Sequence, residues 1–195
     1  CLFDSTRGAG TTNQLYSDST NYQGQDTTLT NLVSFDTNGF TLGATVGYNV
    51  PNFNGADYVS WNWKAGGAAV QNNDGTIQGA NCLVSANQDS GFSITKYTGN
   101  GTSGATFGHG LGQQVGLSIV KNVGSSTYWY VYSNLLPTNN NLYLNTSDSK
   151  QADGVMLGGN STTVSISASS SVNTNSGSYI AYNFASVDGM SRVGS

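Results

Sequence analysis

The chain has 195 residues and a formal net charge of −4, and only 8% of its side chains are charged. Gly, Ser, Thr and Asn supply about half of the residues, all ten acidic residues are Asp, and Pro occurs twice. Because Gly, Asn, Ser and Thr are poor helix formers, this composition argues against a helical bundle and favours an all-β protein. The longest apolar runs are far shorter than the ~20 residues that span a bilayer, so we predict no membrane-spanning segment. Six scattered Lys and Arg residues form no basic stripe, so we also predict no nucleic-acid partner.

Five segments have the residue pattern of β-strands, with alternating apolar and polar residues or many aromatic and branched ones. In chain order these segments are residues 40–46, 58–63, 92–97, 117–121 and 128–132. The second alternates most strictly, with Val59, Trp61 and Trp63 on one face of the expected strand. The last two are rich enough in apolar residues to be central strands of a sheet.

Turn signals recur between these segments. Asn-Gly or Asp-Gly pairs, which tolerate the positive φ of tight turns, begin at Asn38, Asp74, Asn100 and Asp153. Short strands separated by such turns predict an antiparallel β-sandwich of the jelly-roll or lectin-like kind. The only helix that we expect is a single turn near residues 133–136.

Part of the strand pattern occurs twice. Residues 15–20, 40–42 and 58–63 resemble residues 142–147, 164–166 and 179–184, in the same order. This similarity predicts about one and a half tandem repeat units. The predicted parts are a partial β-sandwich repeat at 1–67, a connecting arm at 68–90, a second β-sandwich repeat at 91–188, and the start of a further repeat at 189–195. The alternative is that Ser-, Thr- and Asn-rich strands align by composition alone.

The sequence offers few groups for chemistry. The single histidine, His109, lies between two glycines, and we interpret it as a hydrogen-bonded turn residue rather than a general base or metal ligand. Residue counts alone allow a Ser-His-Asp triad, but no Gly-x-Ser-x-Gly motif supports one. Most Asp residues stand in turn contexts, and Cys1 and Cys82 are predicted to be free thiols. We therefore predict no catalytic residue, no metal site and no cofactor, and expect that the protein is not an enzyme.

Aromatic residues are the best candidates for a binding surface. We select Trp61, Trp63, Trp129 and Tyr132 as residues that could stack against sugars or another surface if their rings are exposed. The alternative is that these rings form the core of the sandwich, because aromatic residues at a period of two commonly pack between sheets.

Several segments also carry a family resemblance. They are residues 2–8, 34–43, 61–66, 91–101, 108–112, 119–122, 129–132, 142–146 and 179–185. Together they resemble a tandem-repeat domain of large structural proteins in tailed phages, particularly phages of marine bacteria and cyanobacteria. The resemblance implies a virion protein built from lectin-like sandwich units, and it implies no catalytic residues.

We therefore expect a tail-fibre or head-fibre protein on the surface of a phage particle, displaying β-sandwich units for attachment to a host surface. Its expected partners are other virion proteins, further copies of itself in a trimer, and a host-surface glycan. The alternatives are a secreted adhesin or carbohydrate-binding module, a capsid decoration protein, and a glycan-degrading enzyme with two facing Asp carboxylates.

Overall fold

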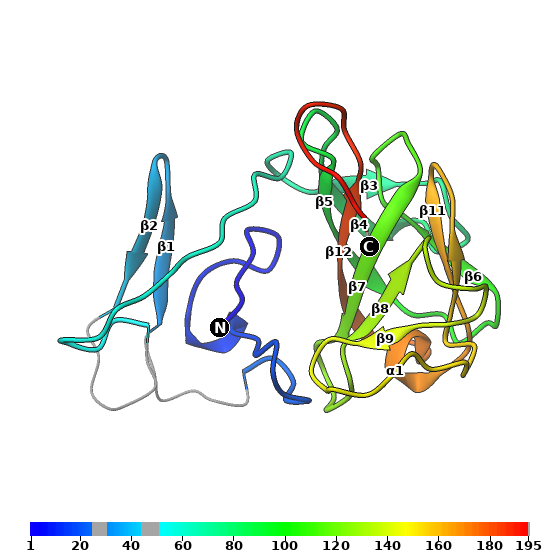
Figure 1. Ribbon diagram of the computed structural model, residues 1–195, viewed down its shortest axis with the longest axis horizontal. Coiled ribbons are helices and arrows are strands. Elements are labelled where there is room, and N and C mark those ends of the chain that lie inside the picture. Colours follow the sequence, from blue (N-terminus) through cyan, green and yellow to red (C-terminus); the bar gives the residue numbers. More distant parts are fainter. Residues whose placement is uncertain (25–30, 44–50, 195) are drawn as a thin grey trace.

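A computed structural model describes residues 1–24, 31–43 and 51–194, and its fold is all-β (Figure 1). The strands are β1 (Leu32–Asp36), β2 (Gly39–Leu42), β3 (Val70–Asn72), β4 (Gly79–Asn87), β5 (Phe92–Thr98), β6 (Ala105–Gly108), β7 (Val115–Asn122), β8 (Tyr130–Ser133), β9 (Leu142–Tyr143), β10 (Met156–Gly159), β11 (Thr163–Ile166) and β12 (Ser178–Ala185). A short 3-10 helix, η1 (Thr11–Asn13), and one turn of helix, α1 (Ser170–Asn173), complete the described elements.

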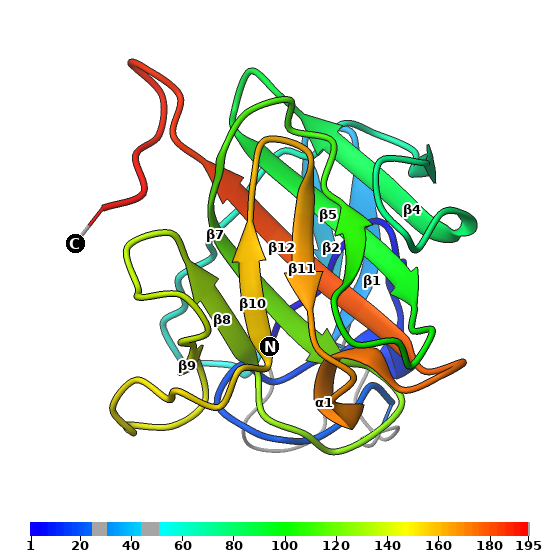
Figure 2. The same ribbon diagram turned by 90° about the vertical axis from the view of Figure 1, so that its right-hand side faces the viewer.

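Two antiparallel sheets form a sandwich, as predicted. The larger has seven strands in the order β3-β4-β5-β12-β7-β8-β9, and the smaller has three in the order β10-β11-β6. Figure 2 shows the smaller sheet lying over the larger one. The last strand, β12, is central, since it pairs with β5 on one side and with β7 on the other.

The front core lies between the two sheets. Tyr179 and Ala181 of β12 face it, because alternate residues of a strand share one face. The ring of Tyr97 stacks between Phe107 and Tyr179, at centroid distances of 4.5 Å and 5.0 Å. Each large apolar side chain buried in this way stabilises the fold by about 1.5–3 kcal/mol.

The back of the larger sheet is covered by the N-terminal segment, residues 1–24, so the sheet is buried on both faces. Ile180 and Tyr182 of β12 pack there with Leu15 and Trp129. The Lys121 ammonium is buried beside this layer, donates to the carbonyls of Thr20 and Thr127 at 3.0 Å and 2.9 Å, and thereby links the two loops to the sheet. Burial lowers the pKa of Lys121 to about 8.

The predicted repeat at 1–67 is not a sandwich. In the described part of that range the strands are β1 and β2, which form a hairpin standing apart from the sandwich (Figure 1). Residues 58–63 form no strand, although the matching residues 179–184 belong to β12. The difference lies in the neighbours: β12 has a partner strand along each edge, whereas no strand of the described residues lies beside residues 59–63. The sequence match between these two segments therefore does not correspond to a shared strand.

Residues 68–90 are not a connecting arm, because they supply β3 and β4 to the larger sheet. Strand β4 pairs with β5 from Cys82↔Tyr97 to Asn87↔Phe92. Its sequence did not predict a strand because its inward side chains, Cys82, Val84 and Ala86, are small, and Leu83 between the first two breaks the alternation of apolar and polar residues. The sandwich consequently begins before residue 91.

Residues 189–194 turn back toward the sandwich: the Ser191 N–H donates to the Val187 carbonyl, and Val193 lies against Gly116. The start of a further repeat at 189–195 stays a prediction. The helical turn is at α1 rather than at 133–136, because the Ser169 side chain accepts a hydrogen bond from the Ser171 N–H and caps it. The predicted strand at 40–46 is described only to residue 43, and its remainder lies outside the described residues.

Candidate functional site

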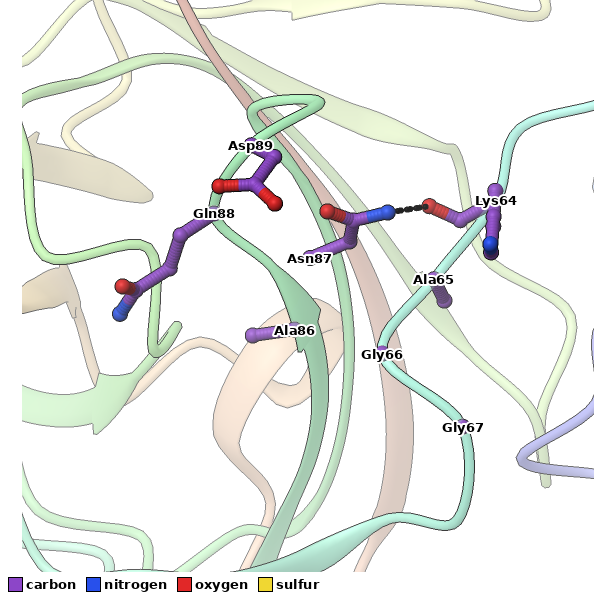
Figure 3. Close-up of a pocket in the computed structure, with 8 residues that line it drawn as sticks. All are labelled: Lys64, Ala65, Gly66, Gly67, Ala86, Asn87, Gln88 and Asp89. Atoms are coloured by element: carbon purple, nitrogen blue, oxygen red, sulfur yellow. Dashed lines mark hydrogen bonds between the residues drawn. The ribbon is translucent and has the colours of Figure 1, made fainter.

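An open groove of about 670 Å³ lies between residues 64–67 and the end of β4 (Figure 3). Its two walls are held together by polar contacts. The Asn87 side-chain amide donates to the Lys64 carbonyl at 3.2 Å, and the Ser85 hydroxyl donates to the Gly67 carbonyl at 2.7 Å. Gly66 is required for this approach, because an added Cβ would lie 1.9 Å from the Ala86 oxygen.

The groove offers hydrogen-bonding groups of several kinds. Figure 3 shows Asn87, Gln88 and Asp89 on the strand side and Lys64 on the other side. Gln88 is held by its bond to the Gly110 carbonyl at 3.0 Å. Sequence reasoning did not identify these residues, because no local motif brings residue 64 next to residues 87–89.

Trp61 and Trp63 stand shortly before this groove in the chain, and Trp63 directly precedes Lys64, which lines it. Trp63 packs on Phe92 and Phe184, at centroid distances of 6.3 Å and 6.0 Å, yet remains 56% exposed. Trp61 is 78% exposed. The structure therefore leaves both rings accessible, as a binding role requires.

Trp129 and Tyr132 are core residues, and their assignment to a binding surface is wrong. Trp129 is completely buried, and its indole N–H donates to the carbonyls of Tyr16 and Ser19. Tyr132 is buried in the front core, with one edge against a recess of about 220 Å³ between β8 and β10. Both were selected with Trp61 and Trp63 because sequence alone does not show which aromatic residues the N-terminal segment or the smaller sheet covers.

Exposed apolar side chains continue on the β1–β2 hairpin. Val33, Phe35 and Phe40 are exposed, and Phe35 and Phe40 are direct cross-strand partners. On the other face, the Ser34 and Thr41 hydroxyls donate to the Asp36 carboxylate and lower its pKa. We call the exposed residues Val33, Phe35, Phe40, Val59, Trp61 and Trp63 the aromatic arm, and Figure 1 shows its two segments outside the sandwich.

His109 is a buried structural residue, which confirms the turn interpretation. Its Nδ1 accepts from the Leu111 N–H and its Nε2 lies 3.2 Å from the Asn160 carbonyl, so the neutral ring with a proton on Nε2 satisfies both contacts. Burial lowers the pKa of His109, and the Asn160 carbonyl only partly opposes this effect.

His109 should make stability depend on pH in a narrow range. The folded-state pKa lies below the ordinary value of 6.5, so the unfolded state binds the proton more tightly. The free energy of unfolding should be constant just above pH 6.5 and should fall as the pH drops from there through the lowered pKa. Each tenfold difference between the acid constants of His109 in the folded and unfolded states changes the free energy of unfolding by about 1.4 kcal/mol.

Urea unfolding at a series of pH values between about 5 and 7 measures this effect. The chain has no Glu and no second His, so the His109→Gln variant should lose the slope almost completely. An unchanged slope in that variant would contradict the assignment.

These contacts suit non-covalent binding. Within the described residues, no group of three or more His, Cys, Asp or Glu side chains could hold a metal ion. Across the same residues, no helix is long and apolar enough to cross a membrane. Cys1 is exposed and Cys82 is buried, both as free thiols. The site can stack a flat apolar face on Trp61 or Trp63 and hydrogen-bond polar groups in the adjacent groove.

A family model described as "Domain of unknown function (DUF7483)" matches residues 1–195, and the chain belongs to this family. No match is found among the curated proteins or among the solved structures.

Proposed function

We propose that this protein is a non-enzymatic structural component of a tailed-phage particle, a tail-fibre or head-fibre protein that displays its β-sandwich for attachment to a host surface. The observation that carries the proposal is the exposure of Trp61 and Trp63, which stand shortly before Lys64 of the polar groove in the chain. The phage assignment itself rests on the resemblance of residues such as 91–101 and 179–185 to virion repeat domains.

A neutral surface glycan is the ligand class that fits best. The apolar face of a sugar ring can stack on an indole, while its hydroxyls bond to the amides of Asn87 and Gln88 and to the Asp89 carboxylate. The net charge of −4 disfavours a strongly acidic glycan. Single contacts of this kind are weak, so attachment would depend on many copies acting together.

Binding of the full chain to host cells and to an array of neutral glycans tests the proposal. Trp63→Ala and Asp89→Asn should each weaken binding about tenfold or more, because each removes one of the two kinds of contact. Met190→Ala is a matched control, since Met190 is 67% exposed and lies outside the aromatic arm. Equal binding by all three variants would contradict this site.

The same groove and rings would serve a secreted adhesin or carbohydrate-binding module, which is the second candidate. Locating the chain in purified phage particles by antibody labelling and electron microscopy separates the two. Label at a free fibre tip supports the fibre, label on the capsid lattice supports a decoration protein, and absence from particles supports the secreted module. Turnover of a polysaccharide would contradict the non-enzymatic assignment.

A further inference from the structure

Residues 59–63 are an extended segment without a sheet. None of their backbone N–H or C=O groups makes a backbone hydrogen bond within the described residues, and Val59 and Trp61 are 80% and 78% exposed. The Asn62 amide donates to the Ser60 hydroxyl at 3.0 Å, which places these two side chains on one face, as in a strand. An exposed extended segment of this kind is a template for pairing with another strand.

The sequence of this segment is complementary to itself in the antiparallel direction. With Trp61 opposite Trp61, the pairs are Val59 with Trp63 and Ser60 with Asn62. Apolar pairs then share one face and hydrogen-bonding pairs share the other, which is the arrangement that stabilises cross-strand neighbours. Moving the centre to Ser60 would instead place Asp57 against Trp63.

We propose that residues 59–63 pair with the same residues of a second copy of this chain, as an antiparallel two-stranded ribbon about a two-fold axis. A symmetric contact of this kind uses the same surface patch on both copies. The pairing goes beyond the proposed function and does not depend on it. Its consequence for that function is that Val59, Trp61 and Trp63 of both copies would lie on one face of the ribbon.

The apolar side chains of the segment are available for such a contact. Val59, Trp61 and Trp63 are 80%, 78% and 56% exposed. A second copy is also electrostatically acceptable, since residues 58–63 carry no charge.

Sedimentation velocity of the full chain over a concentration series tests the pairing without any host surface or glycan. We expect a monomer–dimer equilibrium, and we expect Trp61→Asp to raise the dimer dissociation constant at least tenfold, because it sets two carboxylates opposite each other. Met190→Asp, at a comparably exposed site outside the segment, should change it less than twofold. A chain that stays monomeric at its highest soluble concentration, or a dimer insensitive to Trp61→Asp, would overturn the proposal.

Disulfide trapping tests the register. In a Cys1→Ser background, Trp61→Cys should give a cross-linked dimer on a non-reducing gel, because directly opposite residues lie within disulfide reach. Ser60→Cys should cross-link much less, since its counterpart lies two positions away along the ribbon at about 7–8 Å. Cross-linking that is equal at both positions, or absent at Trp61→Cys, would contradict this register. Neither substitution touches the sandwich, so both variants should keep the wild-type unfolding midpoint.

Discussion

Replacing Arg7 with Met should lower the free energy of unfolding by about 3–5 kcal/mol, because it leaves a buried carboxylate without its cation. Arg7 Nε is paired with Asp4 Oδ2, and the two side chains are 3% and 2% exposed. The Tyr182 hydroxyl donates to the same Asp4 oxygen at 2.7 Å, so the ion pair joins the N-terminal segment to β12. Urea unfolding followed by the fluorescence of buried Trp129 measures the loss.

Two further variants make this result specific. Arg192→Met removes an exposed cation and should change the free energy of unfolding by no more than about 0.5 kcal/mol. The double variant Asp4→Leu with Arg7→Met removes both charges and should recover much of the loss, since an apolar pair can replace a buried ion pair. A single Arg7→Met variant as stable as the wild type would show that the N-terminal segment does not depend on this contact.

The second large effect is expected at Trp129. Trp129→Ala should lower the free energy of unfolding by about 3–5 kcal/mol, because it leaves a cavity in the back core against Tyr182 and removes the indole N–H that the Tyr16 and Ser19 carbonyls share. Trp129→Phe keeps most of the packing and should cost less, about 1–3 kcal/mol, mainly for the lost indole donor. Thermal and urea unfolding of both variants give these values.

Trp61→Ala is the matched control for Trp129→Ala. It removes the same side-chain type from a site that is 78% exposed, so it should change stability by less than about 0.5 kcal/mol. If instead Trp129→Ala kept full stability and lost binding to a surface ligand, the assignment of Trp129 to the core would be wrong.

The comparison of Trp129 with Trp61 also shows what the sequence could predict. Alternation and turn signals predicted the all-β class, and four of the five predicted strand segments overlap β2, β5, β7 and β8. The fifth, residues 58–63, alternates most strictly but forms no strand in the described part of the chain. Alternation of apolar and polar residues indicates only that a segment can form a strand, because its pairing with other strands depends on residues far away in the chain.

No local sequence motif predicts the groove, because the residues that line it are also far apart in the chain. Lys64 and Asp89 are 25 positions apart and meet only because Gly66 lets the chain pass close to Ala86. Strand β4 was missed because Cys82, Val84 and Ala86 are too small to give a strong apolar pattern. The N-terminal segment decides which aromatic residues on the back of the larger sheet are buried. The contacts among Arg7, Asp4 and Tyr182 attach this segment to the sheet.

The position of β12 has a consequence for how the protein folds. This strand is the last of the described strands, yet it separates β5 from β7 and contributes to both cores through Tyr179 and Ile180. While the chain is being synthesised, neither core can close until residue 185 has left the ribosome. The N-terminal segment therefore cannot pack on β12 until that strand, more than 150 residues later in the chain, has been synthesised. Such non-local pairing predicts slow folding, and it predicts that the unpaired edges of β5 and β7 are exposed to aggregation until β12 inserts.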